Sequence, residues 1–230
     1  MVLPYYSAMR PLICCKDLHR TYESTPPLQV LKGVDFTVGR GEIAVILGPS
    51  GTGKSTLMHL LAGLDTPDHG EIWWESLPVH TYRPQKLARL RSKHVGLVFQ
   101  QHYLLEDLTV LENATLPGRL TGELEIQRGE VLLEAVGLSQ RSSAYPKTLS
   151  GGEKQRLAVA RALYHRPPVV LADEPTGSLD RGNARVVYQL LVDLCREDDT
   201  SVVMVTHDEA LVDEVDRKFN LIDGVLVPLD

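Results

Sequence analysis

The sequence has three cysteines among 230 residues, and two of them, Cys14 and Cys15, are adjacent. Adjacent cysteines are too close to bridge one another without strain, and Cys195 is far away along the chain. This usage excludes a small fold held by disulfides and indicates a reducing compartment. Cys14, Cys15 and His19 are residue types that bind metal ions, but no fourth ligand is evident beside them. We therefore interpret the thiols as structural.

Long hydrophobic runs are also missing. The longest apolar runs, such as 43–47 and 202–205, have the length of strands and are too short to cross a bilayer. Residues 1–10 do not combine a basic start with an apolar stretch, as a targeting sequence does. We expect any role at a membrane to depend on a partner protein.

The chain has no excess of positive charge, because 24 Lys and Arg residues stand against 30 Asp and Glu residues. Nucleic acid is therefore not an expected partner. The composition, 43% hydrophobic and 23% charged, is too apolar for a disordered chain. The length suits one α/β domain with a smaller inserted subdomain.

Short runs rich in β-branched residues alternate with segments of helical periodicity. The expected strands are 12–15, 34–38, 43–47, 95–99, 169–172, 201–206 and 219–222. The expected helices are 54–62, 123–136, 153–164 and 183–195. This alternation predicts an α/β fold with a mostly parallel sheet flanked by helices. The early strands, which precede the first helix, are expected to form an antiparallel side sheet.

The pattern changes to helical and loop signals between residues 101 and 146, where asparagine, proline and glycine interrupt the chain. We interpret this stretch as an inserted helical subdomain. The single domain 1–230 is therefore divided into a core of 1–99 and 160–230 and a helical subdomain of 100–159.

A glycine-rich run with the pattern G-x-x-x-x-G-K-[ST] follows the expected strand 43–47 and opens the expected helix 54–62. Such a loop turns its backbone N–H groups toward a phosphate, while a lysine and the positive end of the helix hold the oxygens. A glycine-rich turn that binds nothing is the alternative, but every required position is filled. The predicted ATP-binding residues here are Gly48, Pro49, Ser50, Gly51, Thr52, Gly53, Lys54, Ser55 and Thr56.

Two carboxylates, Asp173 and Glu174, follow the apolar strand 169–172, and His207 follows the strand 201–206. The carboxyl ends of parallel strands meet at one edge of a sheet, so these side chains are expected beside the phosphate loop. Asp173 and Ser55 suit Mg²⁺, and Glu174 suits a general base that activates water. An acid pair alone would fit helix capping equally well. With the phosphate loop it predicts Mg²⁺-dependent hydrolysis of ATP.

The run 149–156 reads LSGGEKQR and resembles the LSGGQ signature of the ABC transporter ATPase family. Ser150 and the glycines Gly151 and Gly152 open a second helix, whose N-terminus favours anions. Ser150 and Glu153 also form a capping box, which fits a purely structural helix start. Glu153 stands where the family usually has glutamine.

The resemblance implies that two copies form a head-to-tail homodimer with two ATP molecules between them. The signature residues of one copy would then bind the γ-phosphate held by the other. The family's remaining landmarks are Tyr22, which stacks on adenine, Gln100, a catalytic glutamine that also contacts the metal, Asp180 of the run 178–180, and His207 near the γ-phosphate. Gln101 leaves the register of Gln100 open, and Tyr22 also fits ordinary packing.

A finer resemblance is to the branch that contains lipoprotein-releasing and macrolide-export ATPases. It rests on HLLAGLDTP at 59–67, VFQQHYLL at 98–105, LTVLEN at 108–113 and ADEPTGSLD at 172–180. It implies a cytoplasmic subunit held at the inner face of the membrane by an integral membrane permease. Cell-division and antibiotic-resistance ATPases share much of the sequence of these motifs. A soluble ABC ATPase acting on ribosomes or DNA is disfavoured by the single cassette and the lack of sustained heptads, and a non-catalytic module by the complete set of hydrolytic residues.

Overall fold

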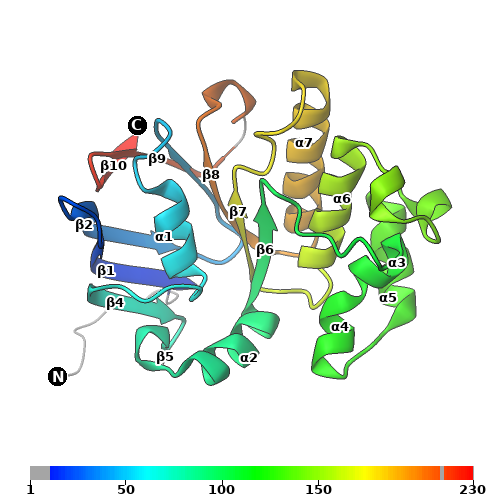
Figure 1. The fold of residues 1–230 in the computed structure, drawn as a ribbon, viewed down its shortest axis with the longest axis horizontal. Helices are drawn as coiled ribbons and strands as arrows, with labels where there is room; N and C mark the ends of the chain where they lie inside the picture. The colour runs from blue at the N-terminus through cyan, green and yellow to red at the C-terminus, as the bar shows by residue number, and fades with distance from the viewer. Residues whose placement is uncertain (1–10, 213–214, 230) are drawn as a thin grey trace.

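A computed structural model describes residues 11–212 and 215–229, so the prediction for residues 1–10 lies outside it. A side sheet, a central sheet and a group of helices follow one another across the molecule (Figure 1). The α/β fold predicted from the sequence is confirmed.

The central sheet has six strands in the order β10-β9-β3-β8-β7-β6. Neighbouring strands are parallel except for the terminal pair β9 and β10. The strands span Ile43–Leu47 (β3), Val95–Phe99 (β6), Val169–Asp173 (β7), Ser201–Thr206 (β8), Arg217–Ile222 (β9) and Val225–Leu229 (β10). Because both faces of this sheet are covered, every residue of β3 and β8 is buried.

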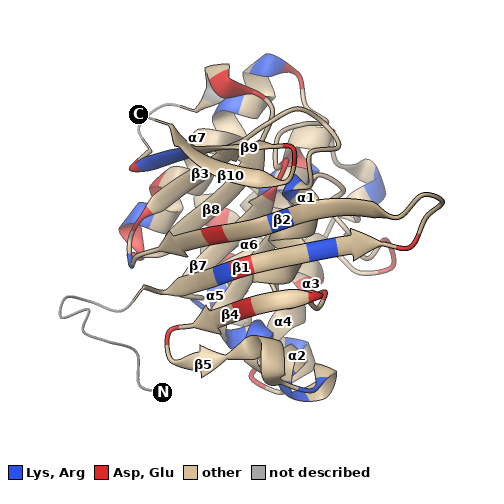
Figure 2. Ribbon diagram, turned by 90° about the vertical axis from the view of Figure 1, so that its left-hand side faces the viewer, with Lys and Arg blue, Asp and Glu red and all other residues tan. Residues whose placement is uncertain are grey.

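The side sheet is antiparallel, with the order β2-β1-β4-β5. Figure 2 shows its outer face, across which β2, β1 and β4 run side by side. Its strands span Ile13–Tyr22 (β1), Leu28–Val38 (β2), His69–Trp74 (β4) and Leu77–Pro78 (β5).

The expectation of an early antiparallel sheet is confirmed for β1 and β2 but is wrong for β3. The reason is that β3 is apolar at every position and is buried on both sides within the parallel sheet. The sequence analysis missed β4, which carries few β-branched residues, and missed β10.

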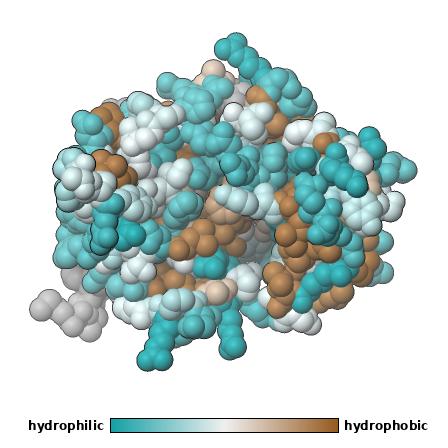
Figure 3. Space-filling model, viewed as in Figure 1, coloured by the Kyte–Doolittle hydropathy of each residue, from teal (hydrophilic) through white to brown (hydrophobic). Residues whose placement is uncertain are grey.

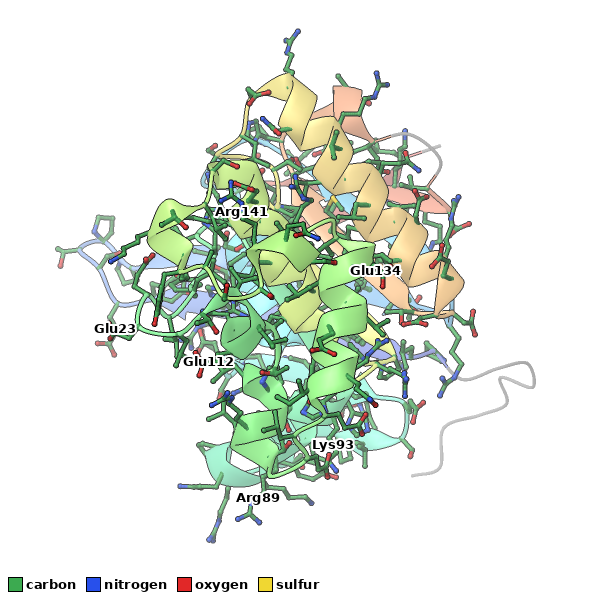
Figure 4. The ribbon with its side chains drawn as sticks, turned by 90° about the vertical axis from the view of Figure 1, so that its right-hand side faces the viewer. Glu23, Arg89, Lys93, Glu112, Glu134 and Arg141 are labelled. Atoms are coloured by element: carbon green, nitrogen blue, oxygen red, sulfur yellow. The ribbon has the colours of Figure 1, made fainter. Side chains whose placement is uncertain are left out.

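Helices cover both faces of the central sheet. They span Lys54–Leu61 (α1), Pro84–His94 (α2), Val110–Ala114 (α3), Leu116–Thr121 (α4), Ile126–Ala135 (α5), Gly151–Ala162 (α6) and Arg181–Glu197 (α7). The sequence analysis did not predict α2, whose side chains are half-buried or exposed. Its Arg89 and Lys93 lie at one end of the face shown in Figure 4, and Lys93 Nζ is 2.7 Å from Glu123 Oε1.

Two hydrophobic cores lie on the two faces of the central sheet. Ala44 and Ile46 of β3 point into a core shared with α1 and the side sheet. Ile43, Val45 and Leu47 point into the opposite core, with α3, α5, α6 and α7. This alternation follows from the period of two in a strand. Because β3 packs against a core on each face, the position of the loop that follows it is fixed.

Cys14, Cys15 and Cys195 are free thiols. Cys14 is half-buried, and the other two are buried. Burial raises the pKa of Cys195 to about 12 and also raises the pKa of Cys15. Both buried thiols are therefore packing groups. Every helix among the described residues is too short or too polar to cross a bilayer.

Candidate nucleotide site

The glycine-rich loop connects the end of β3 with the start of α1. Gly48 has φ +154°, and a Cβ atom there would lie 2.7 Å from the carbonyl oxygen of Leu221. Gly53 has φ +102°, and a Cβ atom there would lie 2.6 Å from Val30. Both positions therefore require glycine, and the conformational freedom of glycine lets the backbone curve tightly between the strand and the helix.

Lys54, the first residue of α1, is 5% exposed. Its Nζ donates to the carbonyl oxygens of Gly48 at 2.8 Å and Pro49 at 3.0 Å. It also lies 3.4 Å from Glu174 Oε1. The ammonium group is thus held against the loop, in contact with the carboxylate of Glu174, the residue that follows β7.

Ser55 and Asp173 form a hydrogen-bonded pair beside Lys54, at the carboxyl edge of the central sheet. The Ser55 hydroxyl donates to Asp173 Oδ1 at 3.1 Å, although 118 residues separate them. Burial raises the pKa of Asp173, and the hydrogen bond from Ser55 opposes that rise. A hydroxyl beside a carboxylate is a hard oxygen donor set of the kind that binds Mg²⁺.

Glu174 lies between the side chains of Lys54 and His207. Its Oε1 faces Lys54, and its Oε2 lies 2.9 Å from His207 Nδ1. Its backbone has φ +46°, and its N–H donates to the carbonyl oxygen of Val205 at 3.0 Å. A left-handed conformation at a residue other than glycine is costly and is often found at functional sites. Here it turns the carboxylate toward the loop.

Gln100 follows β6 at the same edge. An atom placed as Cβ on Gly177 would lie 3.1 Å from Gln100 Nε2 and 3.5 Å from Glu174 Cβ. Gln100, Gly177 and Glu174 are therefore neighbours. Asp180 is the N-cap residue of α7, where its Oδ1 accepts from the Asn183 N–H at 3.1 Å.

Tyr22 ends β1 beside the loop, and the residue is 37% exposed. Its hydroxyl lies 3.4 Å from Thr56 Oγ1, in the first turn of α1. The Arg20 guanidinium lies 5.0 Å from the ring centre. The sequence analysis missed Arg20, because its position depends on ion pairs with Asp65 and Asp68, which are far away along the chain.

Ser150 and Glu153 form the predicted capping box at the start of α6. Ser150 Oγ accepts from the Glu153 N–H at 3.3 Å, and Glu153 Oε2 accepts from the Ser150 N–H at 2.8 Å. Gly152 faces α7, where a Cβ atom would lie 3.0 Å from Asn183 Oδ1. Figure 1 shows α6 and α1 well apart, with β6 and β7 between them. The signature helix is therefore remote from α1 within one chain.

The structure thus gathers most of the predicted site residues at one sheet edge and leaves the signature on a separate helix. The first group is Tyr22, the loop 48–56, Gln100, Asp173, Glu174 and His207.

Next to this edge of the sheet, a cleft of about 410 Å³ is lined by His59, Leu64, Asp65, Phe99 and Tyr103. Figure 3 shows apolar surface on both sides of a hollow in the middle of the molecule.

A phosphate loop with a buried lysine, beside two carboxylates at the carboxyl edge of a parallel sheet, defines a P-loop nucleoside triphosphatase. Residues 31–177 match the family model described as ABC transporter, and the chain belongs to this family. It is an ABC ATPase, and the resemblance stated from the sequence is confirmed.

Relatives with assigned names are similar over most of the chain. The lipoprotein-releasing system ATP-binding protein LolD of Idiomarina loihiensis is 42% identical over 94% of this chain and 96% of its own length. LolD of Bacteroides fragilis is 45% identical over 87% of this chain and 94% of its own length.

Solved structures of ATP-binding cassettes share the fold. The cassette MJ0796, a dimer in a post-hydrolysis state with ADP and Pi, has a TM-score of 0.85 and 35% identity. That match covers 93% of this chain and 96% of the other. The cassette CbiO1 of Clostridium perfringens, part of the ABC transporter complex CbiONQ, has a TM-score of 0.83 and 28% identity, with coverage of 95% and 87%.

Proposed function

We propose that this chain is the ATP-hydrolysing subunit of a transporter that releases lipoproteins from a membrane, with a separate permease as its partner. The observation that carries the chemistry is the Glu174 carboxylate, held between Lys54 and His207 at the phosphate loop. In this proposal Lys54 holds the phosphate oxygens, and Glu174 accepts a proton from the attacking water. His207 orients Glu174. Gln100 lies beside Glu174 and is the proposed catalytic glutamine that also contacts the metal.

The oxygen pair formed by Ser55 and Asp173 fits Mg²⁺, since a hydroxyl and a carboxylate lie within 3.1 Å of each other. When bound, the metal would neutralise charge on the β- and γ-phosphates. Tyr22 supplies a half-exposed ring at the other end of the loop for stacking on adenine.

The proposed working unit is a head-to-tail homodimer. The N-terminus of α6 carries Ser150, Gly151, Gly152 and Glu153, and the positive end of the helix dipole favours an anion there. In one chain this tip is far from the phosphate loop, so only a second copy could bring the two elements together. The dimeric solved cassette at 35% identity supports this arrangement.

The proposed partner is an integral membrane permease that holds the subunit at the inner face of the membrane. The names of the relatives favour lipoprotein release over cell division or antibiotic resistance. The cleft beside Phe99 and Tyr103 is a suitable place for a permease segment, because it lies between the phosphate edge and the helical part. We propose that the helical subdomain around residues 100–146 carries the closure of the dimer to the permease.

Replacing Glu174 by Gln tests the hydrolytic proposal. The amide keeps the size of the side chain but cannot accept the proton, so ATP binding should persist while turnover falls by about 10²-fold or more. The trapped nucleotide should hold two copies together, and gel filtration with ATP should show a dimer. Hydrolysis near the parental rate would overturn the role of Glu174.

Glu197→Gln is the matched control, because it changes the same atoms at the end of α7, away from the loop. It should leave turnover and the monomer–dimer distribution unchanged. Co-purification of the trapped dimer with membrane proteins would support the permease, whereas recovery with ribosomes or DNA would favour the soluble class of ABC ATPases.

A further inference from the structure

Three metal-binding side chains lie together on the side sheet. Asp17 and His19 belong to β1, and His69 begins β4. Asp17 Oδ1 lies 2.9 Å from His19 Nε2, and Asp17 Oδ2 lies 3.2 Å from His69 Nδ1. The ligand atoms of all three residues lie within 4.8 Å of one another.

The backbone of both strands shapes this cluster. His19 and His69 are direct partners in the antiparallel pair of β1 and β4. The register shifts between Lys16 and His19, and Asp17 has φ +50°, so an irregular turn brings the carboxylate to the same place. Gly70, at φ +98°, allows the two strands to approach, since a side chain there would overlap backbone oxygens of β1.

The remaining contacts leave the three donor groups free to share an ion. The Asp17 N–H donates to Asp35 Oδ1 at 2.8 Å, which fixes the turn without using the Asp17 carboxylate. His19 Nδ1 lies 3.4 Å from Gln29 Nε2, so Nε2 is the nitrogen that faces the cluster. The two imidazole rings meet edge to face at 5.6 Å between centres.

We propose that Asp17, His19 and His69 bind one divalent transition-metal ion of the zinc class. Two imidazole nitrogens and one carboxylate suit zinc, cobalt or nickel, whereas Mg²⁺ and Ca²⁺ prefer oxygen ligands. Zinc–ligand distances are about 2.0–2.2 Å, so donor atoms of one ion lie within about 4.4 Å of one another. Small side-chain movements would therefore complete the site.

The exposure of the cluster agrees with an open site. The side chains of His69 and Asp17 are 71% and 59% exposed, so an ion can enter from solvent and keep water as a further ligand. This site differs from the Ser55–Asp173 pair in both donor chemistry and position. A bound ion would link β1 to β4 on the strand that ends at Tyr22.

Zinc binding to the chelator-treated full chain tests the proposal. Calorimetric titration with ZnCl₂ in excess MgCl₂ should show one ion bound, and CoCl₂ should give visible absorption from a histidine-bound ion. His69→Ala should weaken zinc binding at least about tenfold and remove the cobalt spectrum. Asp17→Asn should weaken binding in the same direction.

Cys14→Ser is the matched control, since Cys14 is a half-buried thiol on the same strand. It should leave both signals unchanged, and ATP binding should persist in every variant, which shows that the chain remains folded. Zinc binding that survives His69→Ala, depends on Cys14, or is displaced by equimolar Mg²⁺ would each overturn the proposal.

Discussion

Lys54 carries a positive charge that is almost completely removed from solvent. Its hydrogen bonds to two carbonyl oxygens of the loop and its contact with Glu174 keep it where phosphate oxygens would lie. A buried charge without such partners would be strongly unfavourable. This residue therefore links the stability of the loop to the binding of an anion.

Replacing Lys54 by Ala removes a charge-assisted hydrogen bond to phosphate. Such a bond contributes about 1.5–3 kcal/mol, so we expect ATP to bind about 10- to 160-fold more weakly. Calorimetric titration with ATP and Mg²⁺ measures the change. Lys93→Ala, at an exposed ion pair on α2, is the control and should not alter binding. Equal affinity in the Lys54 variant and the parent would contradict the phosphate-loop assignment.

The helices α3 and α6 both begin with a capping box. Thr109 caps α3 and Ser150 caps α6, and each forms a capping box with a glutamate three residues later. The hydroxyls accept from the N–H of Glu112 at 3.2 Å and of Glu153 at 3.3 Å. The structural contribution of the two caps should therefore be similar, and a difference in function can be measured against it.

We expect Thr109→Ala and Ser150→Ala each to lower the free energy of unfolding by about 1 kcal/mol. Only Ser150→Ala should also reduce ATP hydrolysis, because in the proposed dimer Ser150 contacts the nucleotide of the other copy. Urea unfolding and phosphate release are the two measurements. If both variants hydrolyse ATP equally well, Ser150 has a structural role alone.

The stabilisation by these two capping boxes depends on pH, because each box contains a glutamate. Hydrogen bonds from the backbone of Thr109 and Ser150 lower the pKa of Glu112 and Glu153. A lowered folded-state pKa means that the stabilisation is present above the usual glutamate pKa. It is lost as the pH falls through the lowered value.

The dimer as a whole can be tested by mixing two variants, each of which is impaired in one of the two elements. In a head-to-tail dimer each site combines the loop of one copy with the signature of the other. A pair formed from Lys54→Ala and Ser150→Ala then contains one site in which both elements are intact. With random pairing, half of the dimers are mixed and half of their sites are whole, so activity should recover to about a quarter of the parent value. A mixture as inactive as either variant would contradict this shared site.

The motifs of this chain could be recognised without the structure because each is contiguous and lies beside a strand or helix signal. The loop 48–56 follows an apolar run, and Asp173 and Glu174 end another. Parallel strands place their carboxyl ends at one edge, so the meeting of these residues also followed from the pattern. The helix α2 and the strand β4 were missed because neither has a strong apolar period.

The amino-acid sequence by itself determined the α/β class, the phosphate loop, the acid pair and the family, since these depend on local order along the chain. Only the tertiary structure decided that β3 lies within the central sheet, that Arg20 covers Tyr22 and that His69 meets Asp17. Each of these depends on which strands become neighbours and in what register. That choice is made by the burial of apolar faces and the pairing of backbone groups over long separations, which no local pattern contains.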